Sequence, residues 1–188
     1  LLDGAPSRFA SSADARARGI AMVHQRPRLA ESLSTLDNAL LGDSSFFLGR
    51  ATAARELADS AARWGIELDI ARPAGDLSPA DRLASALLGA LRERPSFLVL
   101  DEPTAVLDPG ERERFLSTAR KVAGESPLGV ILVTHKIDDA LAWADRVTVL
   151  RKGRLAHSLA VADVPGGRER GALWLTAALS PEGASPER

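Results

Sequence analysis

An unbroken apolar run that ends in two adjacent carboxylates is the feature of this chain that most restricts its fold. Residues 97–100 read Phe-Leu-Val-Leu, and Asp101 and Glu102 follow at once. Such a run, preceded by the helix breaker Pro95, is typical of a strand in a parallel sheet that is covered on both faces. Ligands of open α/β sheets bind outside the carboxyl ends of the strands. The run therefore predicts a parallel sheet with both acids at its ligand-binding edge.

Other segments of the chain complete this pattern. Apolar runs at 20–24 and 130–133 predict two more buried strands, and a further strand is expected at 147–150, turning at Lys152 and Gly153. Apolar residues at helical spacing predict helices over 51–64, from Ser78 to before Pro95, and over 109–122 and 138–144. Ser78 is expected to cap its helix, with Pro79 in the first helical position. Alternating strands and helices predict an α/β fold with a largely parallel sheet.

Composition excludes several classes of protein. The 188 residues are 45% hydrophobic and 26% charged, which suits a globular domain with a core of its own. Because 24 basic residues face 25 acidic ones, nucleic acid is not expected as a partner. There is no cysteine for a disulfide or a thiolate metal site, and no apolar run reaches the roughly 18 residues of a membrane span. The chain begins without methionine, so we expect it to be a fragment or a processed product.

The two carboxylates suit phosphate chemistry. Asp101, held by the strand, can bind Mg²⁺ through water, while Glu102 projects beyond it and can orient or deprotonate a water that attacks a phosphate. The alternative is a pair of acids that caps a following helix. The string from Asp101-Glu102-Pro103-Thr104 to Leu107-Asp108 resembles the Walker B motif and D-loop of ABC ATPases. This resemblance assigns Asp101 to Mg²⁺, Glu102 to the catalytic base and Asp108 to communication across a dimer.

The resemblance implies a fold and a division of the chain. It implies a P-loop NTPase-like (RecA-like) parallel-sheet core with an inserted all-helical subdomain, truncated at its N-terminal side. Residues 1–28 would belong to the core up to the Q-loop, and residues 29–95 would form the helical subdomain. Residues 96–156 would return to the core, and residues 157–188 would be a C-terminal extension, partly disordered because residues 180–188 are rich in Pro, Ser, Glu and Gly.

Two polar residues at strand ends fit the same family. His135 ends the apolar run at 130–133, and the segment after it resembles the switch-histidine region, where a side chain reaches the γ-phosphate. Gln25 follows the run at 20–24 and resembles the Q-loop glutamine, which contacts Mg²⁺ or the attacking water and links the core to the helical subdomain. Taken alone, each residue would more often be structural. The sequence of residues 135–151 is similar to the corresponding segment of importer ATPases for simple sugars and nucleosides.

The family's signature motif is altered in this chain. Leu-Ser-Gly-Gly-Gln normally opens a helix that meets the γ-phosphate held by the opposite subunit, and Leu77-Ser78-Pro79-Ala80-Asp81 stands in its place. Pro79 has no N–H to donate, Ala80 adds a side chain where glycine normally approaches phosphate, and Asp81 adds negative charge. Ser78 and Ala80 remain candidate ATP contacts that we expect to be weak. As a capping motif, the same residues need no phosphate to explain them.

One element of an ATP site is missing from the sequence. No Gly-x-x-x-x-Gly-Lys-Ser/Thr string occurs, so this chain alone is expected to bind ATP poorly and to be inactive. The intact parent is expected to be an ABC-type ATPase that uses ATP and Mg²⁺. It would couple hydrolysis to import of sugars or nucleosides, with transmembrane permease subunits and a second ATPase domain as partners, in the cytoplasm on the inner face of the cell membrane.

The sequence leaves two alternatives to an importer ATPase. A non-catalytic ABC-like interaction module would tolerate both the altered signature and the missing loop. However, charges at a buried sheet edge are unfavourable without a ligand, which favours the ATPase. A soluble ABC ATPase that acts in DNA repair or translation is the second alternative. The repair class is disfavoured, because repair proteins insert long coiled coils between the Q-loop and the signature. The interval from Gln25 to Leu77 is too short for them.

Overall fold

The computed structural model describes residues 4–41, 49–165 and 167–179. It divides into two compact units, Leu1–Val133 and Thr134–Arg188, which are described separately. The predicted fraying of residues 180–188 lies outside the described residues, as do Leu1 to Asp3.

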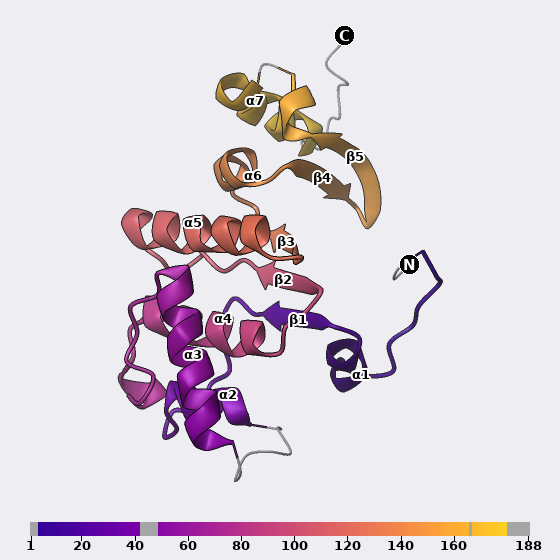
Figure 1. Cartoon of the computed structure of the whole chain (residues 1–188). Coiled ribbons are helices and arrows are strands. Elements are labelled where there is room, and N and C mark those ends of the chain that lie inside the picture. The colour runs from indigo at the N-terminus through magenta and orange to yellow at the C-terminus, as the bar shows by residue number, and fades with distance from the viewer. Residues whose placement is uncertain (1–3, 42–48, 166, 180–188) are drawn as a thin grey trace. The chain divides into compact units, whose positions relative to one another are not determined.

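Three parallel strands form the centre of the first unit (Figure 1). They are β1 (Ile20–Val23), β2 (Phe97–Asp101) and β3 (Gly129–Val133), in the order β1-β2-β3. Val23 pairs with Leu100, and Asp101 pairs with Val133, so all three strands end at one edge. The parallel sheet predicted from the apolar runs is confirmed.

Helices of the first unit follow the predicted order. Three of them, α2 (Thr35–Leu40), α3 (Arg50–Trp64) and α4 (Pro79–Arg92), come between β1 and β2 and pack on one another (Figure 1). This group is the predicted all-helical insertion. The remaining elements are α1 (Ser12–Ala17), the 3-10 turn η1 (Ala74–Asp76) and α5 (Pro109–Glu125). Neither α1 nor α2 was predicted, since each has only six residues and shows too little periodicity.

Local sequence fixes where the longer helices begin and end. Ser78 caps α4 and Pro79 stands in its first turn, as predicted. Asp108 and Glu111 form a reciprocal capping box at the start of α5, with Asp108 accepting from the Glu111 N–H at 2.8 Å. Helix α3 ends at Gly65, whose φ of 69° lies in the left-handed region that glycine adopts without strain.

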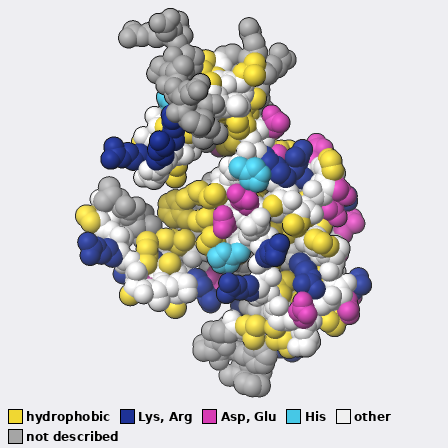
Figure 2. Space-filling model, turned by 180° about the vertical axis from the view of Figure 1, so that it is seen from behind, with side chains coloured by type: hydrophobic (Ala, Val, Ile, Leu, Met, Phe, Trp, Pro, Cys, Tyr) yellow, Lys and Arg dark blue, Asp and Glu magenta, His cyan; other side chains and the backbone are white. Residues whose placement is uncertain are grey.

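The sheet of the first unit is covered on one face. Leu98 and Leu100 of β2 are fully buried on the side where α4 packs against β1 and α5 against β3. The opposite face exposes Met22 by 44%, Ile131 by 52% and Val133 by 46%. Figure 2 shows a group of exposed hydrophobic side chains in the middle of the face that it presents.

This exposure corrects the prediction that all three strands are buried. No residue of β3 is buried, because β3 lies at the edge of the sheet and α5 covers only one of its faces. In β2, Phe97 is exposed and Val99 is half-buried, so this strand is also covered on one face rather than on two. An apolar run shows that both faces of a strand carry apolar side chains. It does not show whether another part of the described chain packs on each face.

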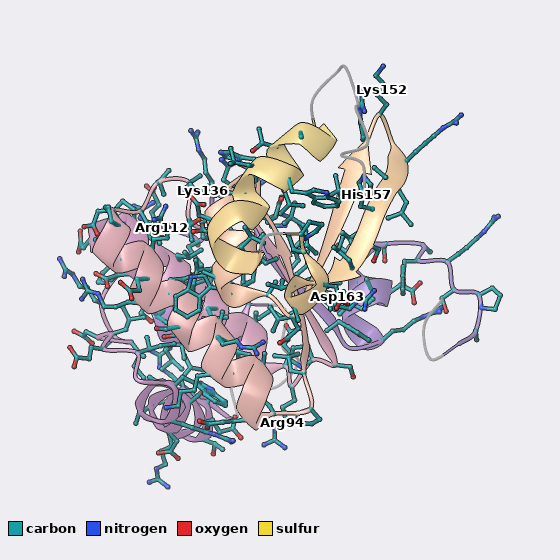
Figure 3. All side chains as sticks on the ribbon, turned by 90° about the horizontal axis from the view of Figure 1, so that it is seen from above. Arg94, Arg112, Lys136, Lys152, His157 and Asp163 are labelled. Atoms are coloured by element: carbon teal, nitrogen blue, oxygen red, sulfur yellow. The ribbon has the colours of Figure 1, made fainter. Side chains whose placement is uncertain are left out.

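The second unit packs a hairpin against two helices. It contains α6 (Ile137–Trp143), the antiparallel strands β4 (Arg146–Arg151) and β5 (Arg154–Ala160), η2 (Val161–Asp163) and α7 (Gly167–Leu179). Its core is built from these side chains: Leu141, Val147, Val149, Val161, Val164 and Leu175. Figure 3 shows Lys152 at the hairpin tip and His157 beside α7, where its ring lies 5.0 Å from that of Trp174. The expected turn at Lys152 is present, and β5 and α7, which were not predicted, follow it.

Candidate functional site

The acid pair leaves the sheet through a strained turn. Asp101 is the last residue of β2, and both it and Glu102 are half-buried. Glu102 has a φ of 44°, and its N–H donates to the Val133 carbonyl at 2.9 Å. Left-handed backbone is unfavourable for a residue with a side chain, and such residues gather at active sites and ligand clamps. Buried Pro103 and Thr104 follow directly and hold the turn in place.

A helix-capping role for this acid pair is not what the structure shows. The residues after Glu102 form a turn, in which the Ala105 N–H donates to the Glu102 carbonyl at 3.2 Å. The next helix, α5, begins only at Pro109 and is capped by Asp108. The capping alternative raised from the sequence is therefore wrong for Asp101 and Glu102.

Gln25 lies at the same edge of the sheet as the acids. It comes two residues after Val23, which pairs with Leu100 next to Asp101. Neighbouring strands lie about 4.8 Å apart, so the loop after β1 and the acid pair leave the sheet side by side. The Gln25 side chain is exposed. A cavity of about 350 Å³ adjoins this loop, and its lining includes Val23, His24, Pro27, Asn38 and Ser85.

The loop that carries Gln25 is fixed by one amide side chain. Asn38 Oδ1 accepts from the Ala30 N–H at 2.8 Å, and Nδ2 donates to the carbonyls of Ala30, Leu33 and Ser34 at 3.0 to 3.1 Å. Both polar atoms of the Asn38 side chain thus hold residues 30–34 against α2. The spacing of Asn38 in the sequence gave no sign of these bonds.

The hydroxyl of Ser78, the serine of the altered signature, forms hydrogen bonds within its own helix turn. Ser78 Oγ accepts from the Asp81 N–H at 3.1 Å and donates to Asp81 Oδ2 at 2.9 Å. Ala80 is half-buried beside it. Ser78 and Asp81 adjoin a cavity of about 390 Å³ that also has Glu67, Glu111 and Arg114 in its wall. The three carboxylates make this surrounding unfavourable for another anion.

Two further predicted site residues, Asp108 and His135, are described apart from the acid pair, Asp108 at the start of α5 and His135 in the second unit. Asp108 is exposed, and its carboxylate is engaged in the capping box of α5, which explains this residue without a partner subunit. His135 belongs to the second unit, where it is exposed and follows β3 in the chain. Its role near a γ-phosphate stays a prediction.

The side-chain oxygen atoms at this site are too few to hold a metal ion by themselves. They fit a Mg²⁺ ion that is shared with a nucleotide. In the described part of the chain, no group of three or more His, Cys, Asp or Glu side chains is placed to hold a metal ion. Asp101 and Gln25 offer oxygen atoms, which Mg²⁺ prefers, and Mg²⁺ usually keeps waters and takes its other ligands from phosphates. These residues fit the magnesium half of such a site. They offer no cradle for the phosphates.

Comparison with known proteins decides the family. No protein-family model matches the chain. A ribose import ATP-binding protein RbsA from Chelativorans sp. is 34% identical over 163 residues, 87% of this chain. Another from Streptomyces avermitilis is 38% identical over 84% of the chain. The solved structure of cbiO1 from Clostridium perfringens, part of the ABC transporter complex cbiONQ, matches 87% of the chain with a TM-score of 0.69 and 26% identity.

The chain belongs to the ATP-binding proteins of ABC transporters. The resemblance stated from residues 101–108 is thereby confirmed, as is the P-loop NTPase fold class. The chain spans 32% of the length of these two import proteins and 63% of the cbiO1 chain. Among the helices that the structure describes, none combines the length and apolar character needed to cross a membrane.

Proposed function

We propose that this chain is part of an ATP-hydrolysing subunit of an ABC importer. The observation that carries the proposal is the acid pair at the carboxyl edge of a parallel sheet, with Glu102 in strained backbone beside the Gln25 loop. Strain of this kind persists only where the surrounding structure enforces it. Glu102 would accept a proton from the attacking water and Asp101 would hold Mg²⁺ through water, with Gln25 orienting that water or contacting the metal.

The remaining site residues take the roles that the family resemblance gives them. His135 would contact the γ-phosphate, Asp108 would contact the opposite subunit, and Ser78 with Ala80 would face the nucleotide held by that subunit. ATP with Mg²⁺ supplies the phosphoryl group and neutralises its developing charge. Because Ser78 already bonds to Asp81, we expect its contact with phosphate to be weak. The ATP site that this chain completes would then be the weaker of two.

The rest of the longer protein would supply the phosphate-binding loop. In support, the sheet has an uncovered apolar face at Met22, Ile131 and Val133, and β3 pairs with only one strand among those described. Parallel sheets are normally covered on both faces. A strand along β3, followed by a helix over this face, would cover it. A Gly-rich loop between that strand and helix would lie at the same edge as Asp101, where the parallel strands end.

Each proposed partner is assigned to a surface near the candidate site residues. Permease subunits would bind beside the Gln25 loop, where the cavity between this loop and α4 lies. A second ATPase domain would face Ser78 and Asp108. The relatives named as ribose import proteins support a sugar as cargo. We place the intact protein in the cytoplasm, bound to the inner face of the cell membrane through its permease.

The competing function is a non-catalytic ABC-like interaction module, and one observation favours it. The bonds between Ser78 and Asp81 account for the signature segment without any nucleotide.

Isothermal titration of Mg²⁺-ATP into this chain and into the longer protein separates the two functions. The ATPase proposal expects heat of binding for the longer protein and none for the 188-residue chain. A longer protein that contains no phosphate-binding loop and takes up no ATP would establish the interaction module instead.

A further inference from the structure

The guanidinium of Arg82 joins two segments that lie far apart in the sequence. Arg82 is in the first turn of α4 and donates from Nη2 to the Gly75 carbonyl at 3.1 Å and from Nε to the Leu77 carbonyl at 3.4 Å. Its Nη1 lies 3.3 Å from Glu31 Oε1. One side chain therefore holds the loop before α4 and also contacts the loop that follows Gln25.

The backbones of these two loops pair with each other. The Gly75 N–H donates to the Glu31 carbonyl and the Ala74 N–H to the Leu33 carbonyl, both at 2.8 Å. Ser34 and Pro73 form an antiparallel bridge, and the Leu36 N–H donates to the Ile70 carbonyl at 3.0 Å. We call residues 31–36 and 70–75 the loop ladder.

Close approach in the loop ladder depends on glycine. A Cβ on Gly75 would lie 3.1 Å from the Glu31 carbonyl oxygen, which is tighter than ordinary packing allows. The ladder is therefore built for contact between the two backbones, and Arg82 closes it at the end nearest α4.

The loop ladder connects the two loops of the candidate site. One side of it continues from the Gln25 loop, which Asn38 holds against α2. The other side leads through Leu77 to Ser78 at the start of α4. The hydrogen bonds of the ladder thus join the two loops directly.

We propose that Arg82 is a positioning residue that couples the Gln25 loop to the start of α4. The inference rests on the proposed function, in which the Gln25 loop meets the permease and Ser78 faces a nucleotide. The bonds to the two carbonyls carry this role more than the ion pair does. Glu31 is 72% exposed, and exposed ion pairs contribute little, whereas a charged donor strengthens a hydrogen bond to a carbonyl.

Hydrogen exchange of this chain tests the structural half of the proposal. Arg82→Ala is expected to speed exchange of the Ala74 and Gly75 amides about fivefold, and Glu31→Gln by less than about twofold. Arg55→Ala, which removes an exposed arginine of α3, is the matched control and should leave both amides unchanged. Unchanged exchange at Ala74 and Gly75 in Arg82→Ala, or an equal effect of Glu31→Gln, overturns the assignment.

A conservative variant covers the case in which Arg82→Ala does not fold. Arg82→Lys keeps the charge but loses the fork that reaches two carbonyls at once. It should therefore speed exchange at Ala74 and Gly75 while the amides of α5 exchange as in the original chain. Equal acceleration at both places would mean general destabilisation and would refute the positioning role.

The functional half is tested in the longer protein with its permease. Arg82→Ala is expected to lower permease-stimulated ATP hydrolysis about fivefold while basal kcat and KM for ATP change less than about twofold, since the residue acts through the loops. Equal loss of basal and stimulated turnover contradicts the coupling. If the unaltered longer protein hydrolyses no ATP, the proposed function fails, whereas the exchange experiment still decides whether Arg82 holds the ladder.

Discussion

The same substitution at the last valine of β1 and of β3 tests whether the two faces of the sheet are covered differently. Val23 ends β1 and is 1% exposed, whereas Val133 ends β3 and is 46% exposed. Valine to threonine keeps the shape and the β-branching and replaces one methyl group with a hydroxyl. At Val23 it removes about 0.8 kcal/mol of apolar burial and buries a hydroxyl for a further 1 to 3 kcal/mol, roughly. We expect Val23→Thr to lower the free energy of unfolding by about 2 to 4 kcal/mol.

Val133→Thr should change the same free energy by less than about 0.5 kcal/mol, as for most surface substitutions. Urea unfolding followed by Trp64 fluorescence gives both values. Trp64 is 7% exposed in the first unit, and Trp143→Phe with Trp174→Phe removes the other two indoles. A loss at Val133 within about 0.5 kcal/mol of the loss at Val23 would refute the uncovered face. In the longer protein, where a further strand and helix are proposed, Val133→Thr should instead cost about 2 kcal/mol.

Two further predictions concern helix ends and are read from thermal or urea unfolding. Ser78→Ala should lower the free energy of unfolding by about 1 kcal/mol and Ser78→Gly by only a few tenths, because glycine is tolerated at an N-cap; equal losses would mean that the cap adds no stability. Gly65→Ala should lower the free energy of unfolding by about 1 kcal/mol, because Gly65 has a φ of 69°. Gly124→Ala should raise it by roughly 0.5 to 1 kcal/mol, because Gly124 lies inside α5 and no atom is near its added Cβ. Equal signs for these two substitutions would contradict the assigned backbone conformations.

Local signals in the sequence were sufficient to predict the long helices. The apolar spacing over 51–64 matches α3, and Ser78 with Pro79 marks the first residue of α4. Both signals act within a few residues, so they do not depend on the rest of the fold. By contrast, no local signal predicted β5 or α7. That short hairpin and helix are stabilised by packing around Leu175 and Val161, which no local signal reports.

Long-range contacts explain most of what the sequence did not predict. The apolar run at 130–133 looks like a buried strand, but burial depends on what lies beside β3, and the run itself does not encode this. The contact of Arg82 with Gly75 and Glu31 joins loops that have no common pattern. The place of the acid pair was predictable, because a parallel strand presents its carboxyl end to the ligand-binding edge.

Hydrolysis by the longer protein after Glu102→Gln substitution tests the central claim most directly. The amide keeps the size of the side chain but cannot accept the proton of the attacking water. We expect radiolabelled ATP to remain bound and unhydrolysed after gel filtration, with turnover reduced by at least about a hundredfold. Turnover equal to that of the unaltered protein would show that Glu102 is not the catalytic base and would contradict the account.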